Sequence, residues 1–322
     1  MLIQWYPGHM TKARREMAAA MPAQDVIIEV LDARMPGASS NPVVTELRAD
    51  KPCVKVLSKS DIADPQITER WLRYFESGRS VAGGARSGGP VLAVALSTDR
   101  PGETRARIAE LCKRLSPRPS GAAKAVRAMI VGVPNVGKST LINTLMNRNV
   151  AVVGDKPAVT KAQQQVVLSN GMVLWDSPGL MWPKLEDEAG SHRLALAGSI
   201  PDTAIDYLNV AMFGAQLFLA EYAERLLARF KLAALPATPE ALIAEIGRRR
   251  GCLRSGGGID LHKAAEILVH EFRSGGLGRI SLESPSDAVG PPRDEAGPQA
   301  GEAVDPLGEP MDPPGEAVDP PI

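Results

Sequence analysis

The stretch Gly132-Val133-Pro134-Asn135-Val136-Gly137-Lys138-Ser139 constrains the fold of this 322-residue chain more than any other feature. It fits the pattern G-x-x-x-x-G-K-[ST], follows a strand pattern over Ala128–Val131 and leads into a helical pattern over Lys138–Met146. The glycines let backbone N–H groups turn inward around a phosphate, and the N-terminus of the next helix adds its positive end. This order predicts a phosphate-binding loop, the P-loop, within an α/β fold.

Lys138 and Ser139 carry the chemistry of this loop. We expect the Lys138 ammonium to neutralise the β and γ oxygens of a bound triphosphate, which makes it a catalytic residue. We expect the Ser139 hydroxyl to ligate Mg²⁺.

Two later segments complete a predicted site for magnesium and the γ-phosphate. Asp176-Ser177-Pro178-Gly179 closes the strand pattern Met172–Trp175, so Asp176 can hold Mg²⁺ through water and the Gly179 N–H can contact the γ-phosphate. Thr160, in the loop between the P-loop and this segment, can complete the metal shell. Each feature alone is more often a turn, but their order after the P-loop predicts a nucleoside triphosphatase.

Short β-branched runs alternate with helical stretches, which is typical of a doubly wound, mostly parallel sheet covered on both faces. From about Ala189 the strand pattern stops and helical periodicity takes over, which predicts an all-helical C-terminal region. The expected strands are Val26–Leu31, Cys53–Leu57, Val91–Leu96, Ala128–Val133, Val166–Leu168 and Met172–Trp175, and the expected helices in this first part are Met10–Ala20, Pro65–Glu76, Glu103–Leu115 and Lys138–Met146.

Charge is unevenly distributed, although the formal net charge is zero. Residues 281–322 carry ten acidic side chains and one Arg, so the rest of the chain is basic. From about Pro285 the sequence is rich in Pro and Gly and poor in aromatic residues, which predicts a disordered acidic tail. The tail is interpreted either as a solubilising extension or as an electrostatic decoy that competes with RNA for the basic body.

The compartment expected for this chain is the cytoplasm. Its apolar runs are too short to span a bilayer, and no signal-peptide pattern opens the chain. The three cysteines, Cys53, Cys112 and Cys252, lie far apart, so neither a disulfide framework nor a zinc module is expected.

Specificity for guanine requires an Asp that pairs with the ring N1 and the exocyclic amine, and no suitable motif follows Asp176. Ahead of the P-loop, however, one predicted strand ends in Ser58-Lys59-Ser60-Asp61, and the next ends in Ser97 and Thr98, where a backbone N–H can meet guanine O6. The base-reading elements therefore precede the phosphate-reading elements. Because a sheet fixes its strand ends in space, this order predicts a circular permutation of a GTPase fold.

Several further motifs carry a family resemblance over about residues 3–283. They are Trp5-Tyr6-Pro7-Gly8-His9-Met10, Leu31-Asp32-Ala33-Arg34, the early Lys59 and Asp61, the P-loop, Asp176-Ser177-Pro178-Gly179-Leu180-Met181-Trp182-Pro183, Leu194-Ala195-Leu196-Ala197-Gly198-Ser199-Ile200, Arg249-Arg250-Gly251, Phe272-Arg273-Ser274-Gly275 and Leu277-Gly278-Arg279. Together they resemble the circularly permuted GTPases, and among these the ribosome biogenesis GTPase A family.

The resemblance implies a GTPase that acts in late assembly of the large ribosomal subunit, binds ribosomal RNA through its helical region and is released on hydrolysis. It divides the chain into a GTPase domain (1–185), a helical RNA- or ribosome-binding domain (186–283) and the tail (284–322). The cofactors are GTP or GDP, Mg²⁺ and K⁺, and the free protein is expected to be monomeric, with no membrane partner. The GTP-binding set is Ser58, Lys59, Asp61, Ser97, Thr98, Pro134, Asn135, Val136, Gly137, Lys138, Ser139, Thr140, Thr160 and Gly179.

One departure from the family pattern concerns the base motif. The family usually has Asn where Ser58 stands, and we expect the shorter side chain to loosen the link between the base pocket and the P-loop. Asp61 and Lys59 remain, so the preference for guanine should survive.

The hydrolytic machinery departs from Ras-like enzymes, which place a Gln next to the Asp-x-x-Gly motif. Here Leu180 occupies that place and cannot orient water, so hydrolysis by the free protein should be slow. The resemblance offers His9 as a substitute that assists the water; the alternative is a packed or phosphate-contacting structural residue. It also implies that Asn135 helps to hold a potassium ion beside the phosphates; the alternative is a hydrogen bond within the loop.

Basic side chains cluster in the helical region and, with the resemblance, predict contacts to RNA phosphates. They are Arg248, Arg249, Arg250, Arg254, Lys263, Arg273 and Arg279. The alternative function is a regulatory GTPase switch with a protein or membrane partner unrelated to the ribosome. An ATP-dependent kinase is disfavoured by the early Lys59 and Asp61.

Overall fold

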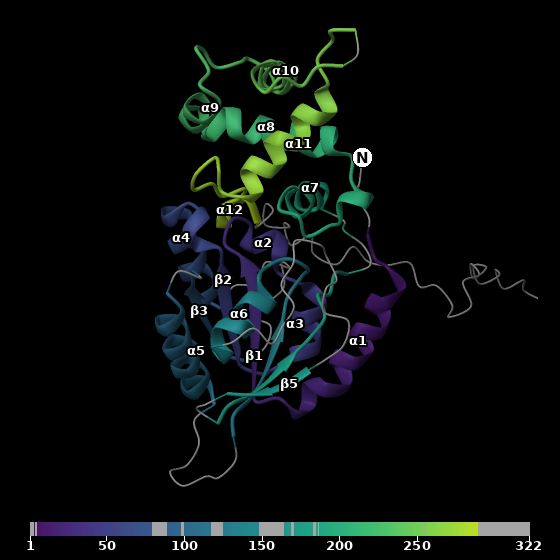
Figure 1. Cartoon of the computed structure of the whole chain (residues 1–322). Coiled ribbons are helices and arrows are strands. Elements are labelled where there is room, and N and C mark those ends of the chain that lie inside the picture. Colours follow the sequence, from purple (N-terminus) through teal and green to yellow (C-terminus); the bar gives the residue numbers. More distant parts are fainter. Residues whose placement is uncertain are drawn as a thin grey trace, which may run out of the picture. The chain divides into compact units, whose positions relative to one another are not determined.

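A six-stranded sheet in the order β3-β2-β1-β4-β6-β5 occupies the first part of the chain (Figure 1). Neighbouring strands are parallel except for β5, which pairs antiparallel with β6 at one edge. The strands are β1 (Val26–Asp32), β2 (Cys53–Ser58), β3 (Val91–Ala95), β4 (Arg127–Val131), β5 (Gln164–Val167) and β6 (Val173–Asp176). The predicted strands are confirmed, with ends shifted by one or two residues.

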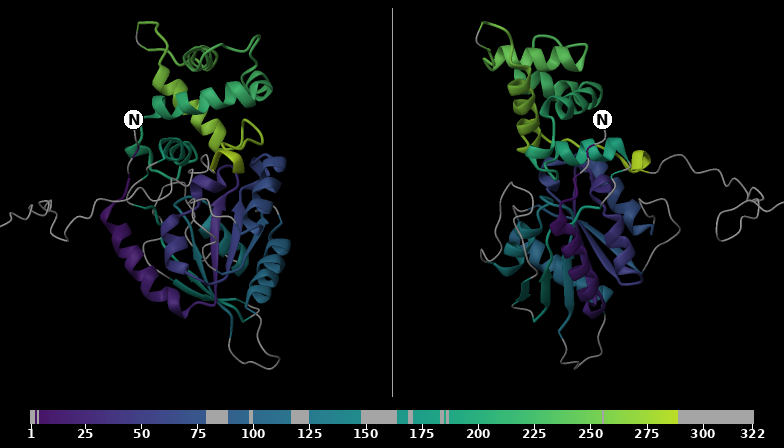
Figure 2. Two further views of the ribbon diagram at one scale, coloured as in Figure 1. Left: turned by 180° about the vertical axis from the view of Figure 1, so that it is seen from behind. Right: turned by 90° about the vertical axis from the view of Figure 1, so that its right-hand side faces the viewer.

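The sheet is covered on both sides, as the sequence predicts. All seven residues of β1 are buried, and since successive side chains of a strand point to opposite faces, both faces of β1 are packed against other elements. The flanking helices are α1 (Gly8–Ala20), α2 (Pro36–Ser39), α3 (Pro42–Arg48), α4 (Pro65–Glu76), α5 (Pro101–Leu115) and α6 (Lys138–Met146), and Figure 2 shows the sheet between them.

The helices α2 and α3 were not expected from the sequence. Each is short and starts at a proline, and α3 contains the β-branched pair Val43 and Val44, so neither shows a clear helical period. Asn41 caps α3, since its side chain accepts a hydrogen bond from the Val43 N–H.

The described residues from 187 onward form helices and one isolated bridge, between Leu253 and Ile259. The helices are α7 (Glu188–Leu196), α8 (Tyr207–Glu221), α9 (Ala223–Phe230), α10 (Pro239–Arg249), α11 (Leu261–Arg273) and α12 (Pro285–Ala288). α8 is the centre of this group, because it packs against α7, α9, α10 and α11. α8 is accordingly the most apolar of the helices from α7 to α11, and its residues Tyr207, Val210, Ala211, Ala215 and Phe218 are buried in the core.

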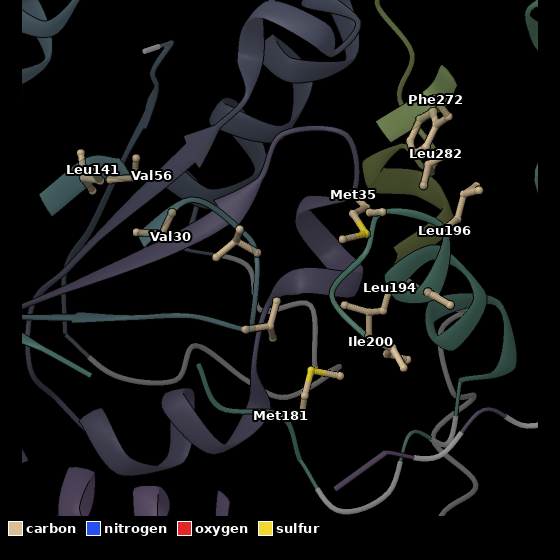
Figure 3. Packing of buried hydrophobic residues seen from close by; sticks show 14 of the residues in the cluster. Val30, Met35, Val56, Leu141, Met181, Leu194, Leu196, Ile200, Phe272 and Leu282 are labelled. Atoms are coloured by element: carbon tan, nitrogen blue, oxygen red, sulfur yellow. The ribbon is translucent and has the colours of Figure 1, made fainter. Parts of the chain in front are cut away.

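One hydrophobic core extends from the sheet into the helices (Figure 3). Val30 of β1 and Met35, just after β1, belong to the same cluster of buried residues as Leu194 of α7 and Phe272 of α11. Met35 lies among side chains from the later helices in the close view. The helices therefore share apolar packing with the end of β1.

The structure describes residues 3, 5–78, 89–97, 100–116, 125–147, 164–168, 171–182, 185, 187–254 and 256–288. Thr98, Thr160 and residues 289–322 of the predicted tail lie outside this set. Met1–Val289 is one compact unit, so the boundary at residue 185 stays a prediction. Within the described part, no helix is both long enough and apolar enough to cross a membrane.

Candidate nucleotide-binding site

The P-loop is pressed against β1, and glycine at its first position makes this possible. Gly132 has a φ of +148°, and a Cβ there would lie 2.4 Å from the carbonyl oxygen of Val30. Any larger residue would push the loop away from the strand. The loop ends at Gly137, and α6 begins at Lys138, as predicted.

The Lys138 ammonium is buried and lies within this loop. Its Nζ donates hydrogen bonds to the carbonyl oxygens of Gly132 at 3.1 Å and Val133 at 2.7 Å. Burial lowers the pKa of Lys138, and the nearby Asp176 carboxylate opposes that shift. A phosphate oxygen is a stronger acceptor than a carbonyl because it is charged, so this cation is well placed to bind the phosphates.

Asp176 ends β6 opposite Ile130 of β4, close to the start of the P-loop. Its Oδ1 is buried and has no hydrogen-bond partner among the described residues. Burial raises the pKa of this carboxyl group, and the Lys138 charge only partly offsets the rise. Burying a carboxylate oxygen without a hydrogen-bond donor costs free energy, and a water bound to Mg²⁺ would supply the missing donor. Ser139, half-buried in the first turn of α6, offers the second expected ligand, so these residues fit magnesium.

The segment after Asp176 lies directly against the P-loop. A Cβ on Gly179 would lie 2.9 Å from Pro134 Cα, so only glycine permits this approach. The Leu180 N–H donates to the Gly132 carbonyl at 3.2 Å, and the Leu180 side chain is buried. On its other side the Leu180 carbonyl accepts a hydrogen bond of 2.7 Å from Asn41 Nδ2. Asn41 was not among the predicted site residues, although the pair Asn-Pro is itself a signal for a capped helix start.

The base motif at the end of β2 contacts the P-loop, although 76 positions separate Lys59 from Asn135. Lys59 Nζ donates to the Asn135 carbonyl at 2.8 Å, and Ser58 Oγ forms a hydrogen bond with the Val136 carbonyl. The short Ser58 side chain therefore still reaches the loop, and the expectation of a looser link than Asn would give stays a prediction. Asp61 follows on a 3-10 turn, half-buried, and its carboxylate makes no hydrogen bond or ion pair with the described residues.

A buried ion cluster adjoins this motif. Asp32 is fully buried and pairs with both Arg34, at 2.8 Å, and Lys59, at 2.9 Å. Burial alone would raise the pKa of Asp32, but the two cations together hold it well below its usual range. Asp32 therefore carries a permanent charge that helps to hold Lys59. From the sequence, Asp32 and Arg34 were recognised only as residues of a family motif, with no role assigned to them.

The other predicted site residues are placed as follows. His9 is exposed at the start of α1 and makes no hydrogen bond or ion pair with the described residues. The Asn135 amide donates out of the P-loop, to the Gly198 carbonyl at 2.8 Å. Ser97 is half-buried, and its carbonyl accepts a hydrogen bond of 3.4 Å from Thr104. Pro134, Val136 and Gly137 lie in the P-loop and Thr140 in the first turn of α6.

The predicted RNA-binding side chains fall into two groups. Five are exposed and lie on α10, just after it or at the start of α11, namely Arg248, Arg249, Arg250, Arg254 and Lys263. Arg248 and Arg249 pair with Glu245, Arg250 pairs with Glu271, and Arg254 lies 3.9 Å from Asp260.

The other two, Arg273 and Arg279, make contacts within the fold. Arg273 is largely buried, pairs with Asp202 and donates to the carbonyl of Leu196. Arg279 is exposed, and its Nε donates to the Asp61 carbonyl at 3.1 Å.

Comparison with known proteins identifies the family of this chain. A family model described as "50S ribosome-binding GTPase" matches residues 127–224, the part that holds the P-loop. A protein of Priestia megaterium named "Ribosome biogenesis GTPase A" is 39% identical over 90% of this chain and 100% of its own length. The chain belongs to the ribosome biogenesis GTPase A family. This GTPase is also 32% identical to the protein of that name from Thermotoga maritima, over 88% of the chain and 95% of the relative.

More distant relatives and solved structures agree with this assignment. "Mitochondrial ribosome-associated GTPase 1" of Mus musculus is 29% identical over 87% of this GTPase and 90% of its own length. The structure titled "Crystal structure of GNP-bound YlqF from T. maritima" matches with a TM-score of 0.57 and 27% identity, over 85% of this chain and 98% of that one. The expected P-loop GTPase fold is thereby confirmed, and the chain is a GTPase whose base motif precedes its phosphate motifs.

Proposed function

We propose that this GTPase reads guanine and the phosphates of GTP in one site built from two separated stretches of chain. The observation that carries the proposal is the contact of Lys59 and Ser58 with the backbone of Asn135 and Val136, because it joins the end of β2 to the P-loop. Asp61 then pairs with guanine N1 and the exocyclic amine. Backbone groups at Ser97 and Thr98 contact guanine O6.

Phosphate binding is assigned to the P-loop residues 134–139 with Thr140, and to Gly179 at the γ-phosphate. The N–H groups of the loop and the Lys138 ammonium bind the β and γ oxygens and stabilise the charge that grows in the transition state. Mg²⁺ would be held by Ser139 and Thr160 directly and by Asp176 through water. When bound, it neutralises phosphate charge.

Hydrolysis needs a group that orients water, and Leu180 cannot provide one because its aliphatic side chain is buried. We assign this role to His9, which is exposed and so accessible to a rearrangement on the ribosomal particle. A potassium ion beside Asn135 supplies positive charge at the phosphates. Turnover by the free protein is therefore slow.

The biological role is assembly of the large ribosomal subunit, in the cytoplasm, by a monomer that docks on precursor RNA and leaves after hydrolysis. The names of the relatives support the ribosomal partner. The exposed cations around α10, which are Arg248, Arg249, Arg250, Arg254 and Lys263, support contacts to RNA phosphates.

The experiment that tests this function is GTP turnover with and without purified large ribosomal subunits, in potassium and then in sodium. We expect subunits to accelerate turnover and sodium to reduce it. Equal rates with and without subunits, together with no GTP-dependent sedimentation with them, would favour a switch with an unrelated partner. Equal rates in sodium and potassium would remove the potassium site alone.

A further inference from the structure

Arg34 is a buried arginine that contacts two distant parts of the chain, with 1% of its surface exposed. Its Nε and Nη2 donate to the two carboxylate oxygens of Asp32, at 2.9 Å and 2.8 Å. Its Nη1 donates to the Phe272 carbonyl at 3.4 Å, and its guanidinium carbon lies 4.6 Å from the centroid of the Phe272 ring. One planar group therefore joins the end of β1 to the last turn of α11.

The contacts continue from Asp32 to the P-loop. The same carboxylate oxygen that binds Arg34 Nη2 accepts a hydrogen bond of 2.9 Å from Lys59, and Lys59 donates to the Asn135 carbonyl at 2.8 Å. Every link in this series is a direct contact between buried or half-buried groups. Phe272 of α11 therefore helps to fix the position of Lys59 through Arg34 and Asp32.

A second set of contacts reaches the same P-loop residue from α11. Arg273, next to Phe272, donates to the Leu196 carbonyl at 3.0 Å, and its Nε would lie 3.3 Å from a Cβ on Gly198. The Gly198 carbonyl accepts the hydrogen bond of the Asn135 amide at 2.8 Å. Asn135 is thus held at its carbonyl and at its side chain by groups that both trace back to α11.

We propose that Arg34 is a positioning residue that fixes Lys59 through Asp32. The affinity for guanine nucleotide then depends on how the last turn of α11 packs against Arg34. This inference rests on the proposed function, in which Lys59 belongs to the guanine-reading motif. Only a guanidinium can bind a carboxylate at two points while it stacks on a ring and reaches a third acceptor; an ammonium cannot. Coupling between sites is reciprocal, so bound nucleotide must in turn restrict α11.

The test compares Arg34→Lys with the wild-type full-length chain in binding a non-hydrolysable GTP analogue with Mg²⁺, and in amide hydrogen exchange over α11. The control is Arg48→Lys, because Arg48, the last residue of α3, is also buried but donates to the Lys51 carbonyl only three residues further along the chain. We expect R34K to bind the analogue about 5- to 150-fold more weakly than the wild type, which is the usual range of coupling between sites. The analogue should slow exchange in α11 of the wild type and of R48K, but not of R34K.

A second pair of variants covers the case in which R34K does not fold. Phe272→Leu removes the ring under Arg34 and leaves every charge in place, while Phe218→Leu removes a neighbouring core ring, 5.5 Å away, that Arg34 does not stack on. F272L should lower the affinity for the analogue more than F218L does. Wild-type affinity and wild-type α11 protection in R34K would overturn the inference, as would equal losses in R34K and R48K or in F272L and F218L. A wild-type chain that fails to bind the analogue would refute the proposed function instead.

Discussion

The nucleotide site and the surface around α10 are both rich in charge, but they hold it in different ways. At the site, Asp32 and Lys138 are buried and have fixed partners, which are cations for Asp32 and backbone carbonyls for Lys138. Asp176 is buried beside Lys138, and its Oδ1 has no hydrogen-bond partner among the described residues. Around α10, Arg248 and Arg249 are exposed and share the surface carboxylate of Glu245. Buried charges need fixed partners because desolvation is costly, whereas exposed pairs contribute little and are screened by salt.

This difference suggests what each region can do. A site of fixed, desolvated charges discriminates between ligands and acts strongly on a transition state. A surface of solvated arginines gives affinity for a phosphate backbone that depends on salt and tolerates substitution. Substitutions should therefore have large, specific effects in the first region and graded, salt-dependent effects in the second.

The largest effect on the rate of GTP hydrolysis is expected at Lys138. Lys138→Ala removes the buried ammonium of the P-loop, and single-turnover GTP hydrolysis should fall by about 10²- to 10³-fold, the range seen when one preorganised donor is lost. Lys113→Ala, which removes an exposed lysine of α5, should leave the rate unchanged. A K138A rate within a few-fold of the wild type would show that buried charge is not decisive here.

An intermediate effect is expected from removing three exposed arginines at the end of α10 together. The affinity for large subunits falls with salt, and the slope of log affinity against log salt concentration measures how many phosphate contacts are made. This slope should become shallower by about one per arginine lost in the triple variant Arg248→Ala, Arg249→Ala and Arg250→Ala. GTP affinity should not change. The matched control removes Arg100, Arg107 and Arg114, which lie at or near α5. If both triple variants weaken sedimentation with subunits equally, the surface around α10 is not the RNA contact.

The smallest effect is expected from two helix caps, one in each region. Asp206→Ala at the start of α8 should lower the free energy of unfolding by about 0.5–2 kcal/mol and leave turnover unchanged. Asn41→Ala should cost a similar amount for the cap of α3. It should also slow turnover by about tenfold, which corresponds to 1.4 kcal/mol, because the Leu180 carbonyl loses its donor. Urea unfolding gives the loss of stability in both variants, and GTP hydrolysis gives their turnover. If N41A hydrolyses GTP as fast as D206A does, the bond from Asn41 to Leu180 does not support the site.

Local physics made part of this structure predictable. The P-loop could be recognised because Gly132 and the helix start at Lys138 are dictated within a few residues. The strands could be recognised because a strand buried on both faces is mostly apolar, as are β1 and β2. The charged residues inside them, Glu29 and Lys55, pair with each other at 2.6 Å. Even the permuted order could be inferred, since strand ends keep their places in a sheet whatever the order of the chain.

The contacts that tie the site together could not be predicted, because they join residues far apart in sequence. Arg34 meets Phe272 and Asn41 meets Leu180 across 238 and 139 positions. No local pattern distinguishes an arginine that holds a fold, such as Arg273, from one on a surface, such as Arg248. Composition placed both in the RNA-binding set, and only burial and partners separate them.

The central claim, that a base motif ahead of the P-loop reads guanine, is tested most directly at Asp61. Asp61→Asn replaces an acceptor for the exocyclic amine by a donor, and xanthosine triphosphate carries a carbonyl at that position. We predict that D61N loses affinity for GTP and gains affinity for xanthosine triphosphate, with a change in their ratio approaching about 10⁴-fold, since a site with unmatched buried polar groups can reject an analogue by that factor. An unchanged preference for GTP in D61N would contradict the account.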